Sequence, residues 1–255
     1  FMNFTILRYD SIGSTNTEAI NQAKRGADEG LCIVAREQTA GRGRLGRDWI
    51  DLTDRVDNAL PMLTFSLGLP MSPASWSGLS LAVGVSLARS LAPHIQLKWP
   101  NDLWLNERKL GGILIETTSI NSQRYAVIGV GINILHAKPS ATTALRTVPA
   151  SLQEINPQAH AASTLAQVIE PLVRTIQMFE TQGFAPFQQS FNALDALQNR
   201  TVLIQDNMNS LANAEQQQNL NQGIAQGVDA TGALIVLTTS GRQLVSSSEV
   251  SIKAM

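Results

Sequence analysis

Three arginines and three glycines alternate within the segment EQTAGRGRLGRDW, residues 37–49. The planar guanidinium groups of Arg42, Arg44 and Arg47 can bind carboxylate or phosphate oxygens through paired hydrogen bonds. Glycine permits positive φ and close backbone approach, and ordering it costs entropy. Residues 39–48, the arginine loop, are therefore predicted to be mobile when free and to close over an anionic small molecule.

Two other interpretations compete for this loop. Gly41, Gly43 and Gly46 fit the G-x-G-x-x-G pattern of dinucleotide-binding loops, which need a strand directly before them and a helix that opens inside them. The apolar run 31–35 ends six residues before Gly41, and residues 47–57 have no apolar stripe of helical period. The dinucleotide interpretation is therefore disfavoured. A solvated basic turn or a nucleic-acid patch remains open from the loop alone.

A second polar cluster lies in an otherwise apolar region, KWPND at 98–102 followed by KLGG at 109–112. Taken separately, Lys98 is typical of a solvated lysine, and the Asn101-Asp102 pair of a turn after proline. Together with the arginine loop, the cluster supplies cations, a carboxylate and glycine gaps. Phosphoryl or nucleotidyl transfer needs that combination, because charge develops on phosphate oxygens and a carboxylate can hold Mg²⁺.

The residues Ser14, Thr15 and Asn16 begin a predicted helix that runs to about Lys24. With Thr15 as N-cap and Glu18 three residues later, they fit a capping box, which the local sequence favours. The alternative is functional: small hydroxyl and amide groups at a helix N-terminus can bind a neutral polar ring such as a urea or an amide.

The composition limits the classes of function. A chain of 255 residues suits one large domain or one plus a small one, and a net charge of −1 excludes a basic field over the whole surface. Cys32 is the single cysteine and lies in an apolar run, so it is predicted to be a buried strand thiol. The three histidines are scattered without metal-ligand spacing. Without a signal peptide or a stretch of transmembrane length, the predicted location is cytoplasmic, with no membrane partner.

The hydrophobic pattern predicts an α+β fold. Consecutive strands joined by turns favour a mixed, largely antiparallel sheet with helices on one face. Predicted strands are 4–9, 31–37, 60–69, 95–99, 102–105, 109–117 and 125–134, and predicted helices are 15–24, 74–91 after a start at Ser72 and Pro73, 164–181 and 184–197.

The pattern of predicted elements changes near residue 200. Short strands at 200–204, 223–228, 233–238 and 243–251 predict a small antiparallel barrel. The chain is therefore predicted to divide into residues 1–198 and 199–255. The Asn- and Gln-rich segment 207–222 is predicted to be an irregular excursion, without an assigned role.

The order of these motifs resembles the biotin protein ligase family. The series STN at 14–16, EQTAGRGRLGRDW, KWPND, KLGGIL at 109–114 and GVGIN at 129–133 spans about half of the chain, and GVDATGAL at 227–234 is similar to that family's final domain. The resemblance implies a class II synthetase-like catalytic domain and an SH3-like C-terminal β-barrel.

The activity that the resemblance implies has two steps. Biotin and ATP, with Mg²⁺, give biotinyl-5'-AMP and pyrophosphate, and a lysine of a biotin carboxyl carrier protein then attacks the adenylate. Some members begin with a DNA-binding winged helix, whereas this sequence begins almost at the catalytic motifs; the expectation is no operator binding, and a homodimer stays open. The alternatives are a lipoate-type acyl ligase on a related fold and a nucleic-acid-binding module.

The resemblance also implies three overlapping groups of site residues. Biotin would be bound by Ser14, Thr15, Asn16, Gln38, Arg42, Gly43, Arg44 and Lys109. The nucleotide would be bound by Arg47, Trp49, Lys98, Asn101, Gly129, Gly131 and Asn133. Lys109, Arg44 and Asp102 would be catalytic: Lys109 would bridge the biotin carboxylate and the α-phosphate, and Asp102 would bind Mg²⁺ or receive the proton of the target lysine.

Overall fold

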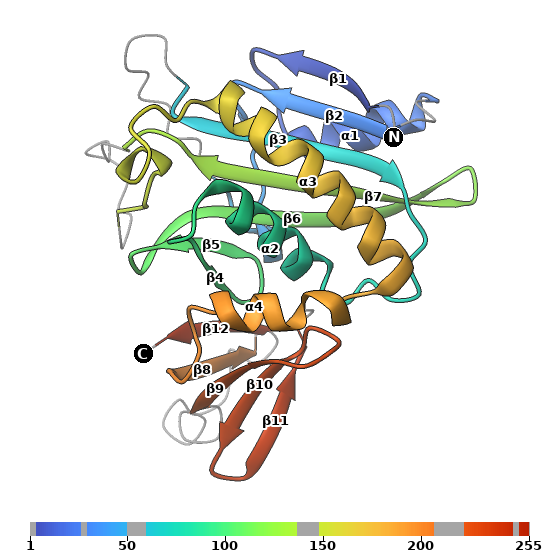
Figure 1. The fold of residues 1–255 in the computed structure, drawn as a ribbon. Helices are drawn as coiled ribbons and strands as arrows, with labels where there is room; N and C mark the ends of the chain where they lie inside the picture. The colour runs from blue at the N-terminus through green and yellow to red at the C-terminus, as the bar shows by residue number, and fades with distance from the viewer. Residues whose placement is uncertain are drawn as a thin grey trace.

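Two β-sheets and four α-helices make up the described part of the computed structural model, which comprises residues 4–26, 30–49, 60–136, 148–206, 222–246 and 250–254 (Figure 1). The larger sheet has the strand order β1-β2-β3-β7-β6-β5-β4, and within it only β1 and β2 pair in parallel. The predicted mixed, largely antiparallel sheet is therefore confirmed. Its strands are β1 Phe4–Tyr9, β2 Gly30–Ala35, β3 Met62–Pro70, β4 Gln96–Lys98, β5 Asp102–Leu105, β6 Arg108–Ile120 and β7 Gln123–Asn133.

The two faces of the larger sheet differ in chemistry because successive residues of a strand point to opposite sides. In β3, Leu63, Phe65 and Leu67 join the main apolar core, while Thr64 and Ser66 alternate with them. The same alternation places Gly129 and Gly131 of β7 between core residues of that strand. One face is thus apolar, and the other carries hydroxyl groups and glycines.

The helices cover both faces. Figure 1 shows α2 (Leu79–Leu91) and α3 (Ala161–Gln182) lying across the apolar face of the larger sheet. By contrast, α1 (Thr15–Lys24) packs Ala19 and Ala23 against Leu31 and Ile33 of β2. Cys32, which lies between these two strand residues, belongs to the main core on the other face. The prediction that the helices lie on one face is therefore wrong, because the alanine stripe of α1 fits the opposite side of β2.

The start of α1 also differs from the prediction. Ser14 is the N-cap, and its side chain accepts no capping hydrogen bond. Thr15 is the first helical residue, and its hydroxyl donates to Gln38 Oε1 at 3.1 Å. The predicted capping box is therefore wrong, since the Thr15 hydroxyl faces the loop after β2 instead of the helix backbone.

The start of α2 lies five residues after the predicted one. Helix α2 begins at Leu79 behind Gly78, whose φ is +80°. Ser77 Oγ donates to the carbonyl of Thr231 at 2.7 Å, so the residues before α2 contact the C-terminal sheet. This long-range contact overrides the Ser72-Pro73 start signal.

The second sheet is formed by the last part of the chain. It has the order β11-β10-β9-β8-β12, all antiparallel, and α4 (Gln188–Leu194), after a short 3₁₀ turn at Ala185–Phe187, packs between the two sheets. The single strand predicted at 243–251 is two strands in the structure, β11 and β12. The division of the chain into domains at residue 198 stays a prediction. Of the Asn- and Gln-rich segment 207–222, only Gln222 lies in the described residues. The strands are β8 Thr201–Asp206, β9 Gln222–Val228, β10 Leu234–Thr238, β11 Gly241–Val245 and β12 Val250–Ala254.

The small sheet contacts the KWPND motif directly. The indole Nε1 of Trp99 donates to the carbonyl of Gly232 at 3.2 Å, in the turn between β9 and β10. Trp99 is buried, so this turn supports the strand end that precedes Asn101 and Asp102. Within the described ranges, no helix has the length and apolarity that crossing a bilayer requires.

Candidate active site

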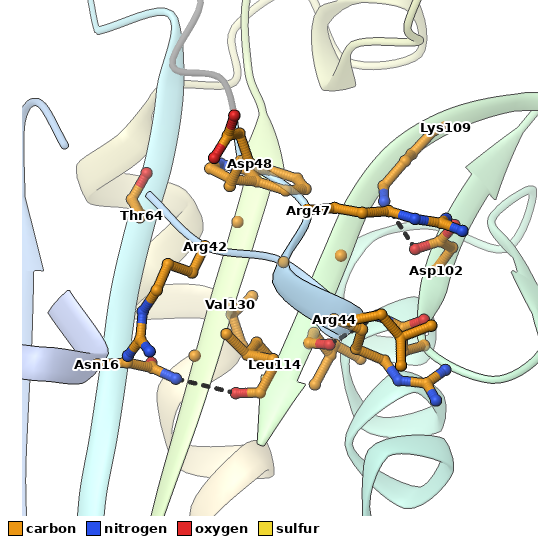
Figure 2. A pocket seen from close by; sticks show the side chains of 18 of the residues that line it. Asn16, Arg42, Arg44, Arg47, Asp48, Thr64, Asp102, Lys109, Leu114 and Val130 are labelled. Carbon is orange, nitrogen blue, oxygen red and sulfur yellow. Dashed lines mark hydrogen bonds and ion pairs between the residues drawn. The ribbon is translucent and has the colours of Figure 1, made fainter. Parts of the chain in front are cut away.

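A cavity of about 200 Å³ lies between the arginine loop and strands β3, β7 and β6, on the sheet face that carries α1 (Figure 2). The fold brings together most residues that the sequence singled out. Fourteen of them line the cavity: Ser14, Asn16, Gln38, Arg42, Gly43, Arg44, Arg47, Trp49, Lys98, Asn101, Asp102, Lys109, Gly129 and Gly131.

The backbone of the arginine loop folds back on itself. Trp49 N donates to the carbonyl of Gly41 at 3.0 Å, and a Cβ at Gly41 would lie 2.6 Å from the Trp49 carbonyl oxygen. Leu45 and Gly46 have φ values of 58° and 70°, and the only regular element of the loop is one 3₁₀ turn. No α-helix opens inside the glycine pattern, so the dinucleotide interpretation is excluded.

One end of the cavity is polar, and the charges beside it, on Arg42 and Glu116, are paired with each other. Gln38 Oε1 accepts hydrogen bonds from Thr15 N at 2.8 Å and from Thr15 Oγ1 at 3.1 Å. Ser66 Oγ donates to Asn16 Oδ1 at 2.6 Å, and all four side chains are buried. Thr15 stands behind Gln38, which explains why it does not line the cavity. This end is therefore preorganised for a neutral polar ring.

The two glycines of β7 make room for side chains of the site. A Cβ at Gly129 would lie 2.2 Å from Asn16 Oδ1, and a Cβ at Gly131 would lie 2.4 Å from Trp49 Cζ2. Glycine inside a strand often marks the close approach of another group. The structure shows that an amide and an indole ring take the two places.

The other end of the cavity is rich in cations. Figure 2 shows Lys109 and Asp102 side by side, with Arg47 extending toward them, and Lys109 Nζ lies 2.8 Å from Asp102 Oδ1. Burial lowers the pKa of Lys98 and of Arg44, and Asp102 opposes the shift in both. Lys109 and Arg47 lower the pKa of Lys98 further. A bound anion would relieve this repulsion, which favours anionic ligands at this end.

Aromatic rings flank the two lysines. Lys109 Nζ lies 5.2 Å from the centre of the Trp49 ring, and Lys98 Nζ lies 4.6 Å from that of Trp104. Trp49 Nε1 is buried and has no hydrogen-bond partner within the described residues. Trp49 thus shields the cationic end and offers an unused donor beside it.

Asn133 lies outside the cavity lining. Its Nδ2 donates to the carbonyls of Lys109 at 3.3 Å and Ala150 at 3.0 Å. The amide therefore holds the backbone of Lys109 against the end of β7. Its predicted contact with a nucleotide stays a prediction.

The sequence analysis missed three lining or supporting residues. Thr64 lines the cavity, Ser66 holds Asn16, and the Glu116 carboxylate accepts from both Asn16 and Arg42. The polar alternation of Thr64 and Ser66 within an apolar strand is a signal that could have found them. Glu116 carries no such signal, since its role depends on the position of α1.

Magnesium was predicted from the carboxylate of Asp102. Among the described residues, no group of three or more His, Cys, Asp or Glu side chains could hold a metal ion. Magnesium is commonly held by one or two carboxylates together with substrate phosphates. Asp102, at the cationic end, fits that mode, so the donor set suits an ion that arrives with a nucleotide.

Comparison with known proteins identifies the family. Residues 9–133 match the Biotin/lipoate A/B protein ligase family, and residues 213–253 match the Biotin protein ligase C terminal domain. A biotin-[acetyl-CoA-carboxylase] ligase of Paracoccus denitrificans is 31% identical over 241 residues, which cover 93% of this chain and 96% of that protein. The chain belongs to the biotin protein ligase family.

Further relatives agree with this family. The bifunctional ligase/repressor BirA of Escherichia coli is 32% identical over 230 residues, covering 88% of this chain and 67% of that protein. The solved biotin protein ligase of Aquifex aeolicus in complex with biotin and ATP superposes with a TM-score of 0.75 at 23% identity, and the match covers 98% of this chain and 99% of that chain. This likeness confirms the fold of a biotin protein ligase.

Proposed function

We propose that this protein activates biotin with ATP to biotinyl-5'-AMP and then transfers the biotin to a lysine of a carrier protein. The observation that carries the proposal is a cavity with a buried polar end, where the charges of Arg42 and Glu116 are paired, and a cationic end. Biotin has matching parts, a neutral ureido ring and a carboxylate tail. The family relationship supports the same reaction.

In the first step, an oxygen of the biotin carboxylate attacks the α-phosphorus of ATP, and the bond to the pyrophosphate oxygen breaks. Both reactants are anions, so they repel each other. Arg44, Arg47, Lys98 and Lys109 line the place where the two would meet and offset this repulsion. Catalysis is then mainly positioning and charge stabilisation, and no protein nucleophile is required.

Lys109 changes partner in this mechanism. Its ammonium nitrogen lies 2.8 Å from Asp102 Oδ1. The biotin carboxylate and the α-phosphate would compete for the ammonium, which bridges them. Asp102 would hold Mg²⁺, and the ion would neutralise phosphate charge there.

In the second step, the carrier lysine attacks the carbonyl carbon of the adenylate, and AMP leaves. The amine must lose a proton, and Asp102 is the alternative acceptor for it. The arginine loop would cover the mixed anhydride and exclude water, which otherwise hydrolyses it. The carrier is predicted to be a biotin carboxyl carrier protein domain.

Two finer expectations belong to this proposal and stay predictions: the absence of operator binding, which titration of labelled duplex DNA decides, and a cytoplasmic location. A homodimer stays open, and analytical ultracentrifugation with and without biotin and ATP decides it.

The rival from the same family is a lipoate-type acyl ligase. The dithiolane ring of lipoate has no hydrogen-bonding groups to match the polar side chains of Ser14, Asn16 and Gln38 that line this end. A site built to hydrogen-bond its ligand discriminates against an analogue that lacks those groups, often by a factor of about 10⁴. A nucleic-acid module is disfavoured too, since the arginines line a cavity of about 200 Å³ instead of a flat basic surface and the net charge is −1.

The test offers both vitamins to the same enzyme. The protein is incubated with ATP, Mg²⁺ and a carrier domain, with either biotin or lipoate, and the carrier is weighed by mass spectrometry. A carrier with its target lysine replaced by arginine is the matched control. We expect a biotin adduct on the unaltered carrier alone, and transfer of lipoate but not biotin would defeat the proposal.

A further inference from the structure

The carboxylate of Glu116 joins two parts of the site that are far apart in sequence. Its Oε2 accepts a hydrogen bond from Asn16 Nδ2 at 2.8 Å and from Arg42 Nη2 at 3.0 Å. Asn16 belongs to α1, Arg42 to the arginine loop and Glu116 to β6. One oxygen therefore connects the neutral end of the cavity, the loop that covers it and the central sheet.

Each partner of Glu116 has a second contact that fixes its direction. The Oδ1 of Asn16 accepts from Ser66, and the missing Cβ of Gly129 leaves the space that this amide fills. The Nη2 of Arg42 also donates to Thr17 Oγ1 at 3.1 Å. Figure 2 shows Arg42 next to Asn16 at the end of the cavity opposite Lys109. The guanidinium thus faces α1 and β6, away from the cationic end.

The charges separate the arginines of the loop into two kinds. Arg42 forms an ion pair with Glu116, whereas Arg44 and Arg47 line the cavity near Asp102. The charge of Glu116 offsets that of Arg42, which weakens the attraction of this arginine for phosphate. Arg42 is therefore suited to anchoring the loop.

We infer that Glu116 is a positioning residue: it anchors the arginine loop through Arg42 and orients Asn16, so that the loop stays closed over bound biotinyl-5'-AMP. This role rests on the proposed function. The side chains of Arg42 and Glu116 are 47% and 26% exposed, and ion pairs that water can reach contribute little to overall stability. Loss of the Glu116 charge should therefore change how readily the arginine loop opens and should leave the overall stability nearly unchanged.

Two substitutions at one position separate the two contacts. Glu116→Gln keeps an acceptor oxygen for Asn16 and removes the charge that holds Arg42, whereas Glu116→Ala removes both. The glutamine variant should release biotinyl-5'-AMP about two- to fivefold faster, with the KM for biotin nearly unchanged, as expected for the loss of one partly exposed ion pair. The alanine variant should show the faster release and a raised KM for biotin.

The salt dependence distinguishes anchoring from a general structural role. Salt screens a partly exposed ion pair, so release from the unaltered protein should accelerate between low and high ionic strength. Release from Glu116→Gln should be much less sensitive to salt. Glu170→Gln is the matched control, because Glu170 pairs with Arg174 on the exposed surface of α3 and should change neither rate.

A ligand-free measurement keeps this inference separate from the proposed reaction. Hydrogen exchange of amides 41–48 should be faster in Glu116→Gln than in the unaltered protein and in Glu170→Gln, at equal melting temperature. Unchanged exchange in these amides would overturn the anchoring role whatever the reaction. If exchange rises but the unaltered protein forms no adenylate, the anchor stands and the proposed function fails.

Discussion

The ammonium of Lys109 contacts both a carboxylate and an aromatic ring. It lies between the Asp102 carboxylate and the Trp49 ring, and the backbone carbonyl behind it accepts from Asn133 and Ala150. The peptide is held by strand pairing, while the ammonium can exchange one anionic partner for another. These are the properties of a group that bridges a carboxylate and a phosphate.

Replacing Lys109 with alanine should slow adenylate formation by roughly 10² or more, the loss typical of removing one group that stabilises developing charge. Single-turnover release of pyrophosphate measures this rate. Lys24→Ala, at the exposed end of α1, controls for the loss of a lysine. A rate equal to that of the unaltered protein would remove Lys109 from the mechanism.

Gly129 tests the neutral end of the cavity. Because a Cβ there would lie 2.2 Å from Asn16 Oδ1, Gly129→Ala must displace the amide and leave buried groups unpaired. An unpaired buried polar group costs about 1–3 kcal/mol, so the KM for biotin should rise about tenfold or more while that for ATP changes little.

Gly13→Ala is the matched control for this substitution, since no atom lies within 4 Å of the added Cβ. Isothermal titration of biotin into both variants gives the comparison without catalysis. Equal biotin affinity of the Gly129 and Gly13 variants would mean that Asn16 has no part in binding the ring.

The site residues that the sequence predicted lie in short contiguous runs, such as GRGRLGR and KWPND, and most of them line one cavity. Ser66 and Glu116 could not be found in this way. They meet Asn16 only because β3, β7 and β6 pair side by side, across 50 and 100 residues of sequence. Thr15 shows the opposite failure. The local sequence predicts a helix cap, whereas in the fold the hydroxyl of Thr15 contacts Gln38, which is distant in sequence.

At the scale of elements, strands were easier to predict than helix starts. Long apolar runs with clear turns gave all seven strands of the larger sheet within a few residues. The start of α2 depends on contacts of Ser77 and Gly78 with the turn at 229–232, and the side on which α1 packs depends on the register of β2. Neither the start of α2 nor the packing side of α1 can be predicted from a short stretch of sequence.

A buried carboxylate lies where α4 meets β4. Ala196 N donates to the carbonyl of Leu97 at 2.8 Å, and Asp195 Oδ1 accepts from Leu197 N at 2.9 Å. The other carboxylate oxygen, Oδ2, is buried without a hydrogen-bond partner within the described ranges. Burial raises the pKa of Asp195 to about 6 from 3.8.

This shift predicts how stability changes with pH. Because the folded pKa lies above the unfolded one, folding favours the protonated acid; the stabilisation is full below about pH 3.8 and is lost as the pH rises through about 6. Between pH 5 and 8, the free energy of unfolding should fall by about 1–2 kcal/mol more in the unaltered protein than in Asp195→Asn. Urea denaturation at both pH values measures it, and parallel pH profiles would contradict the burial argument.

At the scale of the molecule, the larger sheet, the start of α1 and the arginine loop line the cavity, and the C-terminal sheet supports it from behind. The C-terminal sheet supports the KWPND motif through Trp99 and Gly232, which are 133 residues apart. The α+β class, the mixed sheet and a small antiparallel C-terminal sheet followed from the strand pattern. The docking of the two sheets did not, because it depends on one indole and one turn brought together by the whole fold.

The loop itself gives a prediction at this scale. Arg42, Arg44 and Arg47 are potential trypsin sites, and cleavage requires the loop to open. Biotin with ATP and Mg²⁺ should therefore slow cleavage after these arginines, followed by mass spectrometry of the fragments, while cleavage after Arg174 on α3 should not change. Equal cleavage rates with and without the ligands would show that the loop does not close.

The central claim is that one cavity brings a biotin carboxylate to the α-phosphate of ATP. The reverse of that step incorporates labelled pyrophosphate into ATP, and it needs no carrier protein. With Mg²⁺ and ATP, purified protein should exchange pyrophosphate when biotin is present and should lose the exchange in Lys109→Ala. Exchange that does not depend on biotin, or no exchange at all, would contradict the account.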